Sequence, residues 1–364
     1  MSRPTRGRIV TLEHGAGPIA VPAGELAYVL FRRDGRVVSR LVVEGPATVS
    51  EPDASIAPPS PPVLPASAVS IVIATRDRPE ELAACLAALR AHASDALEVI
   101  VCDSASSDAG AVRLAAARGA ASLVRCERPG LSLARNTGAG GARAEVVAFL
   151  DDDCRVEPGW LAGIRGGFED ERVAAVTGSY IPAELDHEAQ LLFLRYAHMD
   201  RRGLERRRFS LGSRESLHWP LDAWRMGSGG NLAVRADALR RAGGFRLDLG
   251  LGTPGQGGED LFLLWSIVRD GADVVYRPDA MVSHRHHRDV ASLHRVLSGY
   301  GSGHAAYLAA ARTSGASRLR TSLYAASVLY DRGKRAAGAL LTGDLARLAL
   351  VGRETHGLLF GGRA

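Results

Sequence analysis

The chain has 364 residues, of which 46% are hydrophobic and 23% charged, a composition typical of a globular protein with a large core. Its 45 basic and 40 acidic residues give a net charge of +5, which is mild for nucleic-acid binding and fits an anionic ligand better, such as a phosphate-bearing substrate or an acidic lipid surface. The four cysteines are widely spaced, so we expect reduced structural thiols rather than a zinc site or a disulfide framework.

The first fifty residues show a β-rich pattern, and we expect them to form a small accessory unit. The segment "ELAYVLFRRDGRVVSRLVVEG" alternates around Asp34-Gly35, a dipeptide typical of hairpin turns. Residues 51–66 hold six prolines in sixteen residues, so we interpret them as a semi-rigid linker and a domain boundary. We find no apolar segment of a secretory signal and no stretch of 18 apolar residues. We therefore expect a cytoplasmic protein, with peripheral contact at the inner face of the membrane as the alternative.

From about residue 68 the pattern alternates between strands and helices. The expected strands are 68–75, 96–103, 121–127 and 145–150, and the expected helices are 78–92, 109–118 and 130–144. This βαβαβαβ order predicts a doubly wound α/β sheet. Polar residues follow three of the strands, at Thr75-Arg76-Asp77, Asp103-Ser104 and Asp151-Asp152-Asp153. Because ligands of such sheets bind at the carboxyl ends of the strands, these positions mark a candidate site.

Glycine motifs do not identify the ligand. A G-x-G-x-x-G pattern at 250–255 follows no apolar strand and contains Pro254, so we reject it as a dinucleotide site, and the chain has no Walker motif.

The run of three aspartates after the strand "VVAFL" is more informative. Two like charges about 5 Å apart repel by about 3 kcal/mol at an effective dielectric of about 20, so a counter-charge is expected. Capping of the helix at "PGWLAGI" is one alternative, although a single aspartate would suffice for it. Adjacent carboxylates suit Mg²⁺ or Mn²⁺, either of which would in turn bind phosphate oxygens.

Eight segments in chain order resemble glycosyltransferase family 2, whose members have the GT-A fold and invert the anomeric centre. They are "VSIVIATRDRPEEL", "EVIVCDSASSD", "GLSLARNTG", "AFLDDDC", "GSGGNLAVR", "RRAGGF", "GGEDLFL" and "VVYRPDAMVSHRHHR", within residues 69–288. The resemblance implies a Rossmann-like mixed sheet at 67–290, with a nucleotide-binding half at 67–154 and an acceptor half at 155–290. A small β-rich unit at 1–50 would precede this domain and a helical extension at 291–364 would follow it.

The implied activity is metal-dependent transfer of a sugar from a UDP-, GDP- or TDP-sugar to an acceptor hydroxyl or other nucleophile, with inversion. The acceptor is not identified by the sequence. The alternatives are a retaining transferase of the same fold, a sugar-nucleotide hydrolase, and a non-catalytic protein that binds nucleotides or carbohydrates.

The resemblance also implies roles for individual residues of the donor half. The base and ribose would contact Thr75, Asp77 and Asp103, and the diphosphate would contact Arg135. The aspartates match the family's DXD motif: Asp153 would bind the metal directly, while Asp151 and Asp152 would contact ribose or support the metal, with Asp151 as a further ligand. Asp103 could instead be a turn residue, and Arg135 could cap or pair on a surface helix.

In the acceptor half, the family pattern places the donor sugar against Gly229, Gly230 and Asn231, which could also form a plain tight turn. Asp260 would be the catalytic base and Glu259 would orient it or bind acceptor, although carboxylates at a helix start are favoured whatever their function. His284 would complete the metal site, and His286 and His287 remain alternatives to it. An imidazole ligand favours Mn²⁺ over Mg²⁺.

Two segments outside these motifs stay open. The stretch 195–219 carries a group of arginines, which could belong to a solvated loop, to a mobile lid, or to a patch for an acidic or lipid-phosphate acceptor. They are Arg195, Arg201, Arg202, Arg206, Arg207 and Arg208. Residues 300–364 form Ala-, Leu- and Arg-rich helices, which we expect to pack on the core or on a second subunit rather than on a membrane surface.

Overall fold

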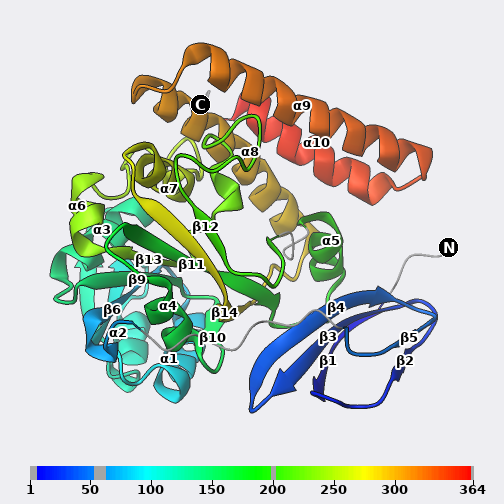
Figure 1. Ribbon diagram of the computed structural model, residues 1–364, viewed down its shortest axis with the longest axis horizontal. Coiled ribbons are helices and arrows are strands. Elements are labelled where there is room, and N and C mark those ends of the chain that lie inside the picture. The colour runs from blue at the N-terminus through cyan, green and yellow to red at the C-terminus, as the bar shows by residue number, and fades with distance from the viewer. Residues whose placement is uncertain (1–5, 53–62, 198–201, 362–364) are drawn as a thin grey trace.

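The computed structural model describes residues 6–52, 63–197 and 202–361 (Figure 1). Within these ranges, an N-terminal group of strands, a central α/β body and a C-terminal layer of helices follow one another along the chain. Most of the 51–66 segment expected to be a linker, and Arg201, lie outside the described residues.

The N-terminal strands form two small sheets. One has the order β1-β3-β4 and the other pairs β2 with β5. Their bounds are β1 (Arg6–Glu13), β2 (Ile19–Val21), β3 (Glu25–Arg33), β4 (Arg36–Glu44) and β5 (Ala47–Val49). The hairpin predicted at Asp34-Gly35 joins β3 to β4, and both residues have left-handed backbone with φ of 53° and 74°. That geometry is the one that matches the twist of two adjacent strands.

The central sheet has nine strands in the order β10-β14-β11-β13-β9-β6-β7-β8, with β12 paired to β14. The strands are β6 (Val69–Thr75), β7 (Glu98–Ser104), β8 (Ser122–Cys126), β9 (Val146–Asp151), β10 (Cys154–Val156), β11 (Val173–Pro182), β12 (Arg207–Phe209), β13 (Asn231–Arg235) and β14 (Asp273–His284). β9, β6, β7 and β8 are mutually parallel, as the predicted βαβ order requires, whereas β13 runs antiparallel between β9 and β11.

Helices cover both faces of this sheet. They are α1 (Pro79–His92), α2 (Ala109–Arg118), α3 (Leu131–Gly141), α4 (Trp160–Gly167), α5 (Glu188–Ala197), α6 (Ala236–Arg241) and α7 (Glu259–Arg269), with short 3₁₀ turns at η1 (Ala66–Ala68) and η3 (Ala223–Arg225). Because side chains alternate along a strand, Val72 of β6 packs in the core that holds α3 and α7, while Ile71 and Ile73 pack in the core that holds α1, α2 and α4.

The N-terminal sheet packs on the central body through its apolar face. Leu26, Tyr28 and Leu30 of β3 form one cluster with Ile181 of β11 and with residues of α5. At the edge of this contact, the Arg32 guanidinium donates to Glu157 at 2.7 Å.

The C-terminal layer consists of α8 (Val290–Thr313), α9 (Arg318–Leu341) and α10 (Leu345–Phe360). α8 packs against α7, and α9 and α10 lie side by side along the upper edge of the molecule (Figure 1). None of the helices in the described ranges combines the length and the apolar character that a membrane crossing requires.

Candidate active site

A cavity of about 1360 Å³ opens at the carboxyl edge of β6 and β9. Its walls come from both halves of the central body and from the C-terminal helices. Thr75 and the three aspartates lie on one wall, the glycines before β13 and the start of α7 lie on the next, and residues of α8, α9 and α10 form the far wall. The cavity thus joins segments that are distant in sequence.

The three aspartates have different surroundings. Asp152 is 5% exposed, and its carboxylate accepts from the Thr75 hydroxyl at 2.7 Å and from Arg78 at 3.2 Å. Burial, together with the neighbouring Asp153 charge, raises the pKa of Asp152. Thr75 lines the cavity and supports Asp152, and its expected place near the base stays a prediction. The capping alternative is excluded, because α4 begins after Gly159 without any side-chain cap.

Asp153 and His284 both line the cavity and lie next to each other. The pairing of β10 with β14 sets Cys154 opposite His284, and the Asp153 Oδ1 atom lies 3.0 Å from His284 Nε2. Burial alone would raise the pKa of Asp153, but His284 and Arg78 hold it below its usual range. Burial alone would lower the pKa of His284, yet Asp153 outweighs it and raises that pKa. The two groups stabilise each other's charged forms.

This pair suits a divalent cation. Ligand atoms of Asp153, Cys154 and His284 all lie within 4.8 Å of one another. The Asp153 Oδ1 atom has His284 Nε2 as its neighbour, and the His284 Nδ1 atom is buried without a hydrogen bond. Burial raises the pKa of the Cys154 thiol well above its usual value, and a thiolate is a softer ligand than Mg²⁺ or Mn²⁺ favours. A carboxylate and an imidazole are ligand types that a divalent cation such as Mn²⁺ accepts.

His286, the alternative ligand, is also buried beside this pair. Its ring centroid lies 4.4 Å from that of His284 and 4.3 Å from that of Phe193. Burial and the His284 charge lower the pKa of His286 well below its usual value, so the ring is neutral.

Arg135 connects the aspartates to the start of α7. Its guanidinium lies 2.8 Å from Asp151 Oδ1 and 2.8 Å from Glu259 Oε1, and the residue is 3% exposed. The guanidinium carbon also lies 5.2 Å from the Phe245 ring centroid. Each of the two terminal nitrogens of the guanidinium therefore pairs with a protein carboxylate. Arg135 is a buried bridge between two parts of the site, and the diphosphate contact expected for it stays a prediction.

The carboxylates at the start of α7 are held differently. Asp260 accepts from the Gly229 backbone N–H at 2.8 Å, through Oδ2. Glu259 is 5% exposed, and burial with the Asp260 charge raises the pKa of Glu259 to about 7. A Cβ at Gly229 would lie 2.8 Å from Arg135 Nη1, and one at Gly230 would lie 2.2 Å from Asp151 Oδ2. Only glycine permits this close approach between the turn and the charged groups.

Three predicted site residues do not line the cavity. Asn231 is fully buried: its Oδ1 accepts from Trp160 Nε1 at 2.9 Å, and its Nδ2 donates to two backbone carbonyls. Asp103 is 1% exposed, accepts from Ser106 N at 2.9 Å and pairs with Arg125. Asp77 accepts from Ser107 N at 2.7 Å. These side chains already have structural partners, and Asp103 lies within β7, so their expected contacts with the nucleotide stay predictions.

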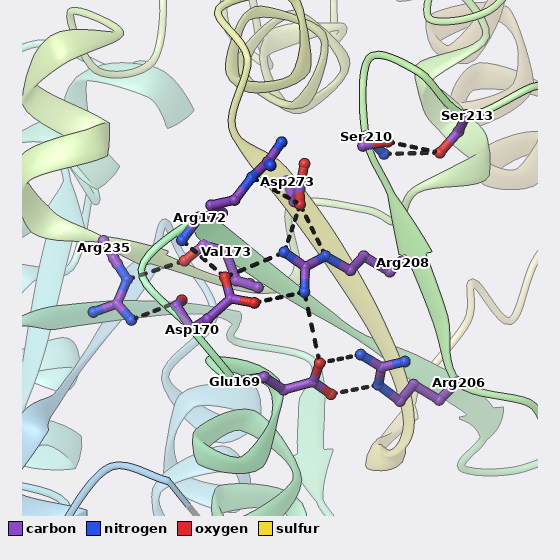
Figure 2. A network of polar contacts seen from close by, with 10 residues as sticks. All are labelled: Glu169, Asp170, Arg172, Val173, Arg206, Arg208, Ser210, Ser213, Arg235 and Asp273. Carbon is purple, nitrogen blue, oxygen red and sulfur yellow. Dashed lines mark hydrogen bonds and ion pairs between the residues drawn. The ribbon is translucent and has the colours of Figure 1, made fainter.

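The arginines of 206–208 all form ion pairs. Arg206 pairs with Glu169, and Arg208 lies 2.7 Å from Asp170 and 2.6 Å from Asp273 (Figure 2). Since Asp273 opens β14, these contacts fix β12 on the edge of the sheet. Of this stretch, Arg202 does line the cavity.

Sequence reasoning missed Arg78 and Tyr180. Arg78 directly follows the first polar strand end, so its place could have been inferred from position, and it pairs with Asp152 and Asp153. Tyr180 lies near the carboxyl end of a strand that is buried along its whole length, where no local pattern marks a functional role. Its ring meets that of His284 edge-on with centroids 6.0 Å apart.

Comparison with known proteins gives a consistent picture. Residues 70–241 match the family model described as glycosyl transferase family 2. The pre-mycofactocin glycosyltransferase of Mycobacterium tuberculosis is 30% identical over 258 residues, which is 70% of this chain and 50% of that protein. The chain therefore spans about half the length of the curated relatives that align over most of it.

Among solved structures, a mannosyltransferase from Pyrobaculum calidifontis in complex with GDP-Man and Mn²⁺ has a similar fold. It aligns with a TM-score of 0.54 at 19% identity and covers 82% of this chain and 89% of that one. This likeness confirms the predicted mixed α/β fold class.

Proposed function

The chain belongs to glycosyl transferase family 2, and we propose that its cavity binds a nucleotide-sugar donor and transfers the sugar to an acceptor with inversion. The observation that supports this most directly is the Asp153–His284 pair, 3.0 Å apart, at the strand edge of a large cavity. Nucleotide phosphates bind at this edge of doubly wound sheets. UDP-, GDP- and TDP-sugars are the donor classes to test.

A divalent cation would be held by Asp153 and His284, with Asp151 as a further ligand. When bound, it would neutralise the diphosphate and stabilise it as a leaving group. The Pyrobaculum mannosyltransferase was solved with Mn²⁺ and GDP-Man, which supports the choice of Mn²⁺ as the first ion to test.

Asp260 is our proposed base. Its Oδ2 is oriented by the Gly229 N–H, and both residues line the cavity. It would take the proton of the acceptor hydroxyl while the acceptor oxygen bonds to the anomeric carbon and the bond to the diphosphate breaks. Glu259 is bound to Arg135, so we assign it a positioning role.

The acceptor would approach along the wall formed by α8, α9 and α10. Tyr300, Tyr324 and Arg332 of these helices line the same cavity. They lie beyond residue 241, where the match to the family model ends. We therefore propose that residues 67–290 carry the donor chemistry and that the helices after them select the acceptor.

The test is release of nucleoside diphosphate from a panel of UDP-, GDP- and TDP-sugars with Mn²⁺ and with water as the stand-in acceptor, followed by NMR of the released sugar before its anomers equilibrate. We expect an inverted product, and Asp260→Asn should keep Mn²⁺-dependent nucleotide binding but lose release. Asp270→Asn, at the exposed far end of α7, is the matched control and should stay active. A product of retained configuration, or full activity in Asp260→Asn, would contradict the proposed mechanism. Binding without release by the unaltered chain would favour a non-catalytic binding protein.

A further inference from the structure

The charges that line the cavity are largely paired within the protein. Four of its acidic residues near the donor end have a guanidinium partner, and so do two other carboxylates of the lining, whereas Asp260 accepts from backbone N–H groups instead. The pairs are Arg78 with Asp152 and Asp153, Arg135 with Asp151 and Glu259, Arg225 with Asp222, and Arg332 with Glu354. These arginines have little charge left to offer an anionic ligand.

Arg202 is different. It lines the cavity, and no carboxylate within the described residues forms an ion pair with it. One nitrogen, Nη2, donates to the Trp224 carbonyl at 2.8 Å. The Nε atom is buried and has no hydrogen-bond partner in the described ranges. A buried donor on a charged group without an acceptor is costly, so this position favours an anion.

The surroundings of Arg202 place it beside the candidate metal site. Burial lowers the pKa of Arg202, while the nearby Tyr276, Tyr180 and Asp260 oppose that shift. A guanidinium nevertheless remains charged in proteins. The Tyr180 ring meets His284, and its hydroxyl would lie 3.2 Å from a Cβ at Gly230. Arg202 therefore adjoins the same space as the carboxylate–histidine pair.

The backbone next to Arg202 is anchored. The Tyr276 hydroxyl of β14 donates to the Gly203 carbonyl at 3.1 Å. A few residues later, the ion pair of Arg208 with Asp273 holds β12 on β14 (Figure 2). The guanidinium is thus carried on a scaffold fixed to the central sheet.

We propose that Arg202 binds the diphosphate of the donor nucleotide, in place of Arg135. This inference rests on the proposed function. As the bond to the sugar breaks, the diphosphate gains negative charge, and a fixed planar guanidinium offers it charge-assisted hydrogen bonds. Arg135, the residue that the family pattern assigns to this contact, is occupied by Asp151 and Glu259.

The test is calorimetric titration of UDP and GDP, with the matching monophosphates and nucleosides, in the presence of Mn²⁺. Arg202→Gln should weaken binding of the tighter diphosphate about 10- to 100-fold and leave nucleoside binding within twofold. Arg202→Lys keeps the charge but loses the planar fork, so it should fall between the two. Arg206→Gln, whose partner Glu169 lies on the surface, is the matched control and should bind like the unaltered chain.

Each outcome decides the question. Diphosphate binding by Arg202→Gln within twofold of the unaltered chain would overturn the inference, and a simultaneous loss of transfer would assign Arg202 to the acceptor instead. If Arg202→Gln does not fold, Arg202→Lys takes its place in the test. A diphosphate affinity of Arg202→Lys equal to that of the unaltered chain would then overturn the inference. If the unaltered chain binds no nucleoside diphosphate, the proposed function itself is wrong, which is a distinguishable result.

Discussion

Replacing Arg135 with methionine removes a buried cation from between two carboxylates while keeping most of the side-chain volume against Phe245. Glu259, whose side chain is 7% exposed, would be left without its partner. Breaking a buried ion pair in this way destabilises a protein by about 3–5 kcal/mol. The Asp151 side chain is 38% exposed, so solvent should replace much of its lost contact and add little to that cost. We therefore expect Arg135→Met to lower the free energy of unfolding by about 3 kcal/mol at pH 8.

The cost should depend on pH in a defined direction. The pKa of Glu259 is raised to about 7 in the folded protein. An acid with a raised pKa is neutral in the folded state below that value and charged above it, so it needs Arg135 only at higher pH. The destabilisation should therefore shrink as the pH falls from 8 to 5.

Urea unfolding at both pH values measures this, with Arg143→Met as the control. Arg143 pairs with Glu98 but its side chain is 72% exposed, so that change should cost less than about 1 kcal/mol. A loss below about 1 kcal/mol in Arg135→Met, or the same loss at both pH values, would refute the bridging role.

Two further changes test other parts of the structure. Arg208→Met should lower the free energy of unfolding in urea by about 2 kcal/mol, because its partner Asp273 has a side chain that is only 4% exposed. The same change should leave nucleotide affinity unchanged. Weaker nucleotide binding would show that residues 206–208 contribute to the site. His304 has its pKa lowered to about 4, by burial and then by Arg332, so the neutral ring stabilises the fold above about pH 6.5 and this contribution is lost as the pH falls towards 4. Between pH 6.5 and pH 4, His304→Gln should lose up to about 3 kcal/mol less free energy of unfolding than the unaltered chain loses. An equal loss in both proteins would show that the ring is solvated.

The sequence predicted the strand and helix order well because each signal was local. The run Val69–Thr75, the Asp34-Gly35 turn and the proline at the start of α1 all act within one element. The expected helix at 130–144 is shorter, ending at Gly141, since glycines near its end weaken it. The C-terminal segment is helical as expected, and α10 packs on α8.

The candidate site was harder to predict, because side-chain partners depend on distant elements. The strand ends marked the correct edge of the sheet, and the structure brings Asp153 and His284 together. Local sequence could not show that the Asn231 side chain would accept a hydrogen bond from Trp160, or that Arg135 would form ion pairs with two carboxylates. It also could not separate Arg202 from the neighbouring arginines, since their difference lies in which of them finds a carboxylate on another strand.

The central claim is that Asp153 and His284 hold a divalent cation that binds the donor's diphosphate. Its most direct test is calorimetric titration of UDP and GDP into the chain with Mn²⁺ and with EDTA, repeated for Asp153→Ala. We predict binding that requires Mn²⁺ and disappears in Asp153→Ala, while that variant keeps the circular dichroism spectrum of the unaltered chain. Nucleotide binding of equal affinity in EDTA, or unchanged Mn²⁺-dependent binding in Asp153→Ala, would contradict the claim.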